Sequence, residues 1–295
     1  MKKRIHHCLI ISLLTGCALL CSCTSFKPGY KFLIDKQTEK DRVVLLNKAA
    51  ELEANAGTAE DVEKLIEAYK EVEQADPMNY RALWKIGNYN MLMGAAYAEK
   101  RRFKKKYYKE AVQYCEKAMC TNPDFRKATE NGAKVTETLD LLTIDQLDAM
   151  GYWYTARFYY FSEALKGMGR LINTRIVIQN NQMIERIDEL DSTWAGGGNY
   201  FARGLYYIAI PERFGGSKER SAREFAMAIE IGPNYIVNRW GRAKYLYDLI
   251  GDEEGFMSDM EWVLEQDPRT AGNPYPWNVY FQNDTRKMLK AREVK

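Results

Sequence analysis

Residues 232–268 have the sequence GPNYIVNRWGRAKYLYDLIGDEEGFMSDMEWVLEQDP. Pro233 and Pro268 lie near the two ends of this stretch, 35 residues apart. Apolar residues between them recur with helical periodicity, and no convincing strand alternation is present. Proline cannot continue a preceding helix, whereas the polar residues beside it can cap the next one. The stretch therefore predicts helices separated by proline turns.

The same combination of helix stop and helix start occurs at four places along the chain. The four breaks are Asp76-Pro-Met-Asn-Tyr80, Asn122-Pro-Asp-Phe125, Gly232-Pro-Asn-Tyr235 and Asp267-Pro-Arg-Thr270. The interval between the last two prolines is close to the period of about 34 residues that is typical of tetratricopeptide repeats.

Counting backward from each proline places apolar and small residues at the packing positions of that repeat, with two insertions. Tyr200, Gly204 and Tyr207 keep their mutual spacing but lie five residues early because of the inserted residues 213–217, and an insertion also follows Leu83, Ile86 and Gly87. The matching residues are Trp240, Tyr247, Phe256, Met260 and Val263 before Pro268; Phe225, Ala228, Tyr200, Gly204 and Tyr207 before Pro233; Ala111, Cys115, Ala118, Leu83, Ile86 and Gly87 before Pro123; and Leu65, Tyr69 and Val72 before Pro77. Small residues let antiparallel helices approach closely, and aromatic rings fill the space between pairs. The chain resembles tetratricopeptide proteins, and we expect an all-α, tetratricopeptide-like helical-repeat solenoid of antiparallel helix pairs.

Residues 139–191 are expected to form a further helix pair, in which residues 151–161 carry rings on every helical face. Such a helix is central in a fold or lines a cavity. An arginine among rings must reach solvent, a carboxylate or a ligand anion. We therefore predict a ligand-lining surface made of Trp153, Tyr154, Arg157, Phe158, Tyr200 and Tyr207. The alternative is that these rings are ordinary core, as aromatic stripes at helical spacing often are.

The N-terminus has the features of an export signal. Basic residues 2–4 precede an apolar segment that is too short for a stable membrane span. Both Leu14-Thr-Gly-Cys17 and Leu20-Cys-Ser-Cys23 fit a bacterial lipobox. We prefer Cys23 as the acylated residue, because it leaves a longer apolar segment and a polar mature start, and Cys17 is the alternative. The predicted divisions are a lipoprotein signal peptide at residues 1–22, a tether at 23–40 and a helical domain at 41–293.

The predicted acylation indicates where the protein is located. Acyl chains on a terminal cysteine bury many CH₂ groups, which makes attachment to a membrane essentially permanent. Neither Ala18 nor Thr24, which follow the two candidate cysteines, is an aspartate of the kind that retains lipoproteins at the inner membrane. We therefore expect a periplasmic protein anchored by lipid, with the outer membrane favoured.

The chemistry of most enzymes is missing. Histidine occurs only at His6 and His7, inside the predicted signal peptide, which excludes histidine-dependent nucleophiles and histidine metal sites from the mature chain. Gly196-Gly-Gly198 lacks the lysine of a phosphate loop and is predicted to form a turn. Cys115 and Cys120 point about 140° apart on a helix and are expected to be packed thiols. We predict no enzyme, no catalytic residues, no metal site and no cofactor.

Charge is balanced except at one place. The formal net charge is +3, and removing residues 2–4 leaves 40 basic and 40 acidic residues, which argues against a nucleic-acid partner. The stretch Lys100-Arg-Arg-Phe-Lys-Lys-Lys-Tyr-Tyr-Lys109 is the strongest charge feature. It is either a solvated extension between helices or a contact for anionic lipid headgroups or an acidic partner.

Several pieces, taken in order, resemble one family. They are Asp76-Pro-Met-Asn79, Met93-Gly-Ala-Ala-Tyr97, Tyr152-Trp-Tyr154, Leu190-Asp191, Gly196-Gly-Gly198, Gly204-Leu-Tyr-Tyr207, Gly215-Gly216 and Ala222-Arg-Glu-Phe-Ala-Met-Ala-Ile229. Over residues 40–290 this order resembles the TatT family, periplasmic tetratricopeptide lipoproteins that accompany the solute-binding component of tripartite ATP-independent periplasmic (TRAP) transporters.

The resemblance implies helical repeats around a hydrophobic cleft or pore, docking of a periplasmic solute-binding protein, and a homotrimer. We therefore expect a lipoprotein scaffold that binds a TRAP-type solute-binding protein and a hydrophobic ligand and assists ligand uptake. The alternative is a structural envelope lipoprotein that uses its repeats to organise a membrane-associated protein complex.

Overall fold

The computed structural model describes residues 26–33 and 42–293, and this part of the chain contains helices and no strand. The all-α prediction is therefore confirmed. The α-helices are α2 (Arg42–Glu53), α3 (Ala59–Ala75), α4 (Tyr80–Leu92), α5 (Arg101–Met119), α6 (Pro123–Glu130), α7 (Leu147–Tyr159), α8 (Met168–Ile172), α9 (Arg175–Asp191), α10 (Trp194–Ala209), α11 (Lys218–Ile231), α12 (Ile236–Gly241), α13 (Asp248–Ile250), α14 (Glu253–Glu265) and α15 (Tyr275–Glu293).

Helices end and begin at the predicted proline turns. Helix α3 ends one residue before Asp76, and the side chain of Asn79 accepts a hydrogen bond from the Ala82 N–H at 3.0 Å, which caps α4. Asn122 caps α6 in the same way. The fourth turn differs, because α14 ends at Glu265 and α15 begins only at Tyr275.

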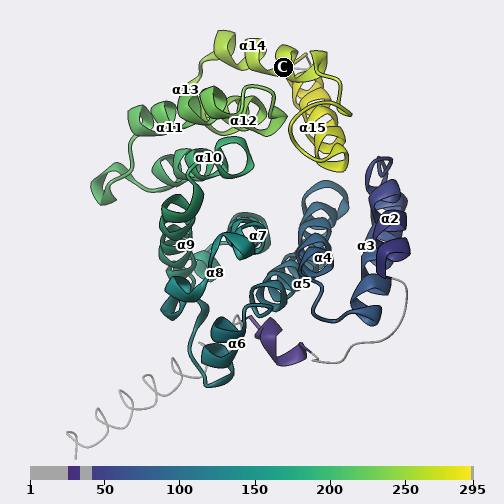
Figure 1. Cartoon of the computed structure of the whole chain (residues 1–295). Coiled ribbons are helices and arrows are strands. Elements are labelled where there is room, and N and C mark those ends of the chain that lie inside the picture. The colour runs from purple at the N-terminus through teal and green to yellow at the C-terminus, as the bar shows by residue number, and fades with distance from the viewer. Residues whose placement is uncertain (1–25, 34–41, 294–295) are drawn as a thin grey trace, which may run out of the picture.

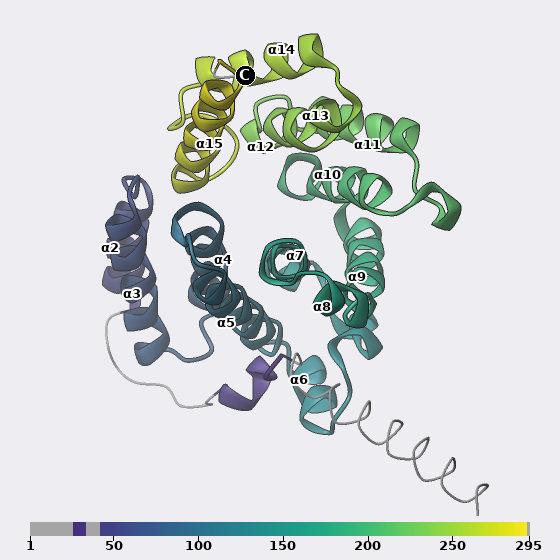
Figure 2. The same cartoon turned by 180° about the vertical axis from the view of Figure 1, so that it is seen from behind.

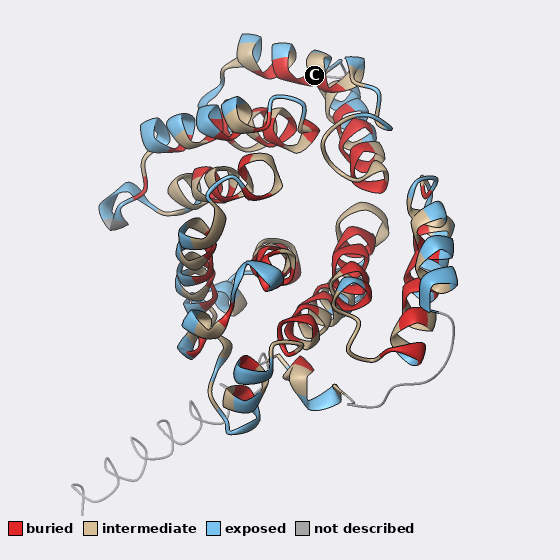
Figure 3. Cartoon of the chain, viewed as in Figure 1, coloured by how far each residue is buried: buried red, intermediate tan, exposed pale blue. Residues whose placement is uncertain are grey.

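Consecutive helices pack side by side in an arc around α7 (Figures 1 and 2). Helix α2 packs on α3, α4 on α5, α10 on α11 and α14 on α15. Helix α7 contacts α4, α5 and α9, so it occupies the inside of the arc. Burial follows this arrangement: α4, α7 and the second half of α5 are largely buried, whereas the outer faces of α2 and α11 are exposed (Figure 3).

Most of the predicted packing positions lie in the core. Fully or almost fully buried among them are Leu65, Tyr69, Val72, Leu83, Ile86, Ala111, Cys115, Ala118, Phe225, Ala228, Trp240, Phe256, Met260 and Val263. Tyr200, Tyr207 and Tyr247 are only half-buried. Cys115 and Cys120 are buried free thiols, as predicted.

The C-terminal helix closes the arc against the N-terminal helices. The indole N–H of Trp277 in α15 donates to Asn88 Oδ1 in α4 at 2.8 Å, although 189 residues separate them. Arg269, just before α15, donates to the Ala54 carbonyl oxygen at 3.0 Å. These bonds join the two ends of the helical chain.

The predicted helix pair over residues 139–191 begins later than expected. Residues 135–146 form three short 3₁₀ turns, Val135–Glu137, Leu139–Leu141 and Ile144–Gln146, and α7 starts at Leu147. Thr143 and Gln146 bond to each other's backbone in a capping box, which starts the helix there.

Part of the predicted tether packs on the body. Residues Gly29–Phe32 form a 3₁₀ helix, η1, against α5, and the Gly29 N–H donates to Glu116 Oε2 at 2.6 Å. Cys17, Cys23 and the predicted signal peptide lie outside the described residues. Among the described helices, none is both long enough and apolar enough to cross a bilayer.

Candidate ligand cavity

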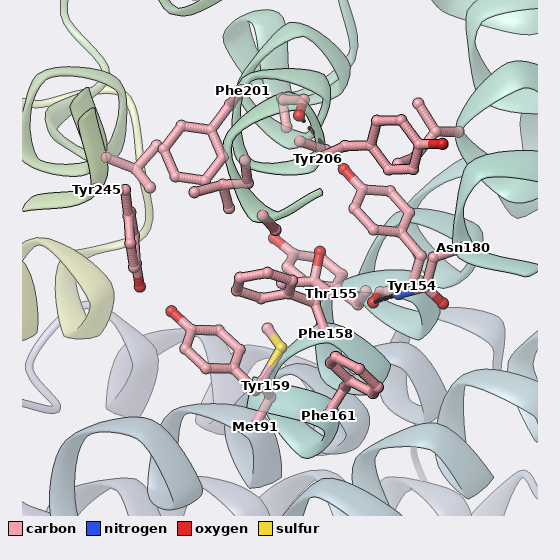
Figure 4. A pocket seen from close by; sticks show the side chains of 18 of the residues that line it. Met91, Tyr154, Thr155, Phe158, Tyr159, Phe161, Asn180, Phe201, Tyr206 and Tyr245 are labelled. Carbon is pink, nitrogen blue, oxygen red and sulfur yellow. Dashed lines mark hydrogen bonds between the residues drawn. The ribbon is translucent and has the colours of Figure 1, made fainter. Parts of the chain in front are cut away.

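A cavity lies between α7 and the helices that surround it. Its volume is about 190 Å³. It is lined by Met91 of α4, by α7 and the turn that follows it, by α9 and α10, and by residues of the C-terminal third of the chain. The lining side chains include Tyr154, Thr155, Phe158, Tyr159, Phe161, Asn180, Phe201, Tyr206 and Tyr245 (Figure 4).

Among the residues that the structure describes, no charged side chain lines this cavity, and 12 of the 27 lining residues are aromatic. The tryptophans present carbon rather than N–H to the interior. The indole N–H groups of Trp194, Trp240 and Trp277 donate to Asp148, Asp284 and Asn88, at 3.0, 3.1 and 2.8 Å. None of these three acceptors lines the cavity. The cavity is therefore an apolar, aromatic environment suited to a hydrocarbon or an amphipathic molecule.

Several polar groups on the wall form hydrogen bonds within the protein. The Tyr154 hydroxyl donates to the Gly198 carbonyl oxygen at 3.3 Å, and Asn180 Nδ2 donates to the Tyr154 carbonyl oxygen at 3.0 Å. Burial raises the pKa of the phenols of Tyr154, Tyr159 and Tyr245. These phenols are therefore uncharged at neutral pH, which keeps the wall neutral.

A left-handed turn in α10 shapes one side of the cavity. Ala195, Gly196 and Gly197 have φ values of 50°, 64° and 85°, inside the first turn of α10. The predicted glycine turn lies here, and Ala195 and Gly198 reach the cavity wall. A Cβ atom on Gly197 would lie 2.8 Å from the Cα of Ala228 in α11, so only glycine allows this approach.

Two π-helical turns position further side chains on the wall of the cavity. Helix α7 continues into η6 (Tyr160–Ala164), and α12 continues into η8 (Arg242–Tyr247). A π turn contains one extra residue per turn, which rotates the following side chains relative to the helix. Phe161 in η6 and Tyr245 in η8 both line the cavity.

The structure places the six predicted lining residues in three different environments. Tyr154 and Phe158 line the aromatic cavity. Trp153 and Arg157 face a second cavity, on another side of α7. Tyr200 and Tyr207 line neither; the Tyr200 ring stacks on the guanidinium of Arg203, and the Tyr207 ring on that of Arg220.

The second cavity has a volume of about 520 Å³ and is lined by charged groups as well as apolar ones. Arg157, which is 6% exposed, donates to Asn180 Oδ1 at 3.2 Å and lies 4.2 Å from the Trp153 ring. Glu116, which is 5% exposed, accepts from Trp153 Nε1 at 3.1 Å. Burial raises the pKa of Glu116 and lowers that of Arg157 to about 10.

Several lining residues were absent from the sequence prediction. Trp194, Phe201, Tyr245, Trp277 and Phe281 come from α10, η8 and α15. Each is an ordinary aromatic position in its own helix, and only the closure of the arc brings them to one cavity. The available signal was compositional, since the chain has 20 tyrosines and 6 tryptophans.

Within the described residues, no group of three or more histidine, cysteine, aspartate or glutamate side chains could hold a metal ion. The fold and the cavity define an all-helical protein with an uncharged aromatic pocket. The family model described as TRAP transporter T-component, TAtT, matches residues 80–294, which is 215 of the 295 residues. The chain therefore belongs to the TRAP transporter T-component family, which confirms the resemblance. A comparison with curated proteins found no match.

Proposed function

We propose that this chain is a periplasmic T-component lipoprotein that holds an apolar or amphipathic ligand in the aromatic cavity and docks a TRAP-type solute-binding protein, assisting ligand uptake. The observation that carries the ligand part is the absence of charge from the 27 residues of the cavity wall. Membership of the T-component family supports a transport-associated, non-catalytic role. The site residues of this proposal are Tyr154 and Phe158, together with the other aromatic residues of the cavity wall.

The scaffold of the proposal is a tetratricopeptide-like solenoid. Its support is the packing of consecutive helices and the burial of the small residues Ala111, Ala118 and Ala228 at helix contacts. Antiparallel pairs stacked in one direction leave a broad surface for a protein partner. We assign that surface to the solute-binding protein, and we propose a homotrimer as the assembled form.

The anchor of the proposal is an acylated cysteine, Cys23 in preference to Cys17, which attaches the protein to the periplasmic face of the outer membrane. Native mass spectrometry of detergent-extracted protein reports the acyl mass, the number of subunits and any retained ligand together. A mature chain that begins at Cys23 without added acyl mass would contradict the anchor alone.

The ligand part is tested with the fluorescent apolar probe N-phenyl-naphthylamine. Ala202→Trp places a large ring in the cavity, because Ala202 lines it and is 9% exposed. We expect this variant to lose probe binding while its helical circular dichroism is retained. Met227→Trp, on the exposed side of α11, is the matched control and should bind as the parent does. Equal binding by both variants would place the probe elsewhere.

The partner part is tested by crosslinking in the periplasm followed by purification of the chain. Recovery of a TRAP solute-binding protein supports the proposal. Recovery of outer-membrane assembly proteins with no transporter protein would instead support the alternative, a structural envelope lipoprotein that organises a membrane-associated complex.

A further inference from the structure

The first described residues of the chain are fixed to the body rather than free. The Phe26 ring lies 4.7 Å from the Tyr160 ring in η6 and 5.2 Å from the Arg157 guanidinium. Gln113 Nε2 donates to the Lys27 carbonyl oxygen at 3.0 Å. A Cβ atom on Gly29 would lie 1.9 Å from the Gln113 carbonyl oxygen, so glycine is required for this close packing on α5.

This attachment limits how far an acylated cysteine can lie from the body. Cys23 is three residues before Phe26, a reach of about 10 Å for a fully extended chain. A lipid on Cys23 therefore holds the surface around Phe26 close to the bilayer. From Cys17 the reach would be roughly 30 Å, which imposes no such restriction.

The surface near Phe26 exposes apolar side chains. Met168, Leu171 and Ile172 of α8 are 67%, 66% and 50% exposed. Ile172 lines the second cavity together with Phe26. Helix α8 is tied to η6 by Arg170, which donates to the Leu165 carbonyl oxygen at 3.1 Å and to the Ser162 carbonyl oxygen.

The same surface carries basic residues. Residues 164–184 contain Lys166, Arg170 and Arg175 and no acidic residue. Helix α5 adds the basic stretch of residues 100–109, whose Lys104 pairs with Glu163 of η6 and whose Lys109 Nζ lies 5.9 Å from the Phe26 ring. Element η6 thus joins the N-terminal segment, α8 and the basic half of α5.

We propose that α8 and the basic half of α5 form a membrane-docking surface that inserts Met168, Leu171 and Ile172 among anionic lipid headgroups next to the lipid anchor. This inference rests on the proposed acylation at Cys23. Exposed apolar residues beside lysine and arginine are the combination that an anionic interface binds. Docking orients the body on the membrane instead of leaving it on a free tether.

The experiment uses acylated full-length mature protein in vesicles of equal parts phosphatidylcholine and phosphatidylglycerol. An environment-sensitive dye is attached at Leu171→Cys or, as the matched control, at Leu249→Cys of α13, which is 59% exposed and lies far from α8 in Figures 1 and 2. The native thiols Cys115 and Cys120 are buried and should not react. We expect a blue shift and several-fold stronger quenching by brominated lipid at position 171 only.

Charge is tested in the same vesicles. Lys106→Glu with Lys166→Glu, both exposed positions, should reduce the quenching at position 171 to the level found in pure phosphatidylcholine. Equal quenching at positions 171 and 249 in acylated protein would overturn the docking surface and leave the ligand and anchor proposals intact. Absence of an acyl group in the mass spectrum would remove the anchor and this inference together, while probe binding to the cavity would be unaffected.

Discussion

Gly197 shows how one residue controls the wall of the cavity. Its φ of 85° lies in the left-handed region, and its Cα faces the main chain of Ala228. Gly132 also has a positive φ, 98°, but no atom of the described residues lies within 4 Å of the position of an added Cβ. Substitutions at the two glycines therefore distinguish the cost of backbone strain alone from the cost of strain together with steric overlap.

We expect Gly132→Ala to cost about 1–2 kcal/mol of unfolding free energy, from left-handed strain alone. Gly197→Ala should cost about 2–5 kcal/mol, because overlap with α11 is added to that strain. Urea unfolding followed by circular dichroism measures both values. Equal losses would show that α11 moves away without resistance.

The buried carboxyl group of Glu116 makes the stability of the protein depend on pH. It accepts from Gly29 N–H and Trp153 Nε1, and Arg157 lies near, yet burial dominates and raises the carboxyl pKa. A raised pKa in the folded state means that the folded protein binds more protons than the unfolded one between the two pKa values. Stability from this group is therefore present at low pH and is lost as pH rises through the folded pKa.

We expect the unfolding free energy of the parent, relative to Glu116→Gln, to fall between about pH 4 and neutral pH. Urea unfolding of both proteins across this range is the measurement, since the glutamine cannot titrate and serves as the reference. A difference that grows with pH would mean that Arg157 stabilises the ionised carboxylate more than burial opposes it.

At the scale of elements, the contact between α7 and Trp194 of α10 shapes the wall of the cavity. Gly151 in α7 faces the ring of Trp194, and a Cβ atom there would lie 1.9 Å from the ring atom Cη2. Trp194 is fixed at its other end by the bond to Asp148. The small residue on one helix thus makes room for the aromatic wall carried by the other.

Gly151→Ala tests this contact, because the substitution has two opposing effects on stability. Alanine gains about 1 kcal/mol of helix propensity over glycine. We nevertheless expect a net loss of stability and weaker probe binding, because the Trp194 ring must leave its place. Thermal unfolding and probe titration measure the two changes, and a more stable variant with unchanged probe affinity would contradict the expectation.

At the scale of the whole molecule, the bond between Trp277 and Asn88 joins α15 to α4. Asn88 is fully buried, and its Nδ2 group has no hydrogen-bond partner among the described residues. Loss of the indole N–H would leave both polar atoms of the amide unsatisfied inside the protein. This single bond therefore stabilises the closure of the arc.

We expect Trp277→Phe to lower the unfolding free energy by about 1–3 kcal/mol and to increase hydrogen exchange in α15. Trp262→Phe in α14 is the control, because its half-buried ring stacks on Arg239 and packs on the core, and a phenyl ring keeps both contacts. The loss at this position should stay within about 1 kcal/mol. Unchanged exchange in α15 of the Trp277 variant would show that other contacts close the arc.

The sequence by itself determined that the chain is helical and where most turns lie. Proline and a capping asparagine act within a few residues, so the starts of α4 and α6 followed from local chemistry. The core positions Phe256, Met260 and Val263 followed from helical periodicity for the same reason. The packed η1 did not, because it depends on contacts with α5. The start of α7 was missed although its signal, the Thr143–Gln146 capping box, is local.

Tertiary structure alone decided which rings share a cavity. Trp153 and Tyr154 are neighbours in sequence, yet they face two different cavities of α7, because successive residues of a helix point about 100° apart. Trp277 reaches the same cavity as Tyr154 only because α15 returns to α4. Periodicity identifies the apolar faces of a helix, whereas the partner of each face is set by how the whole chain packs.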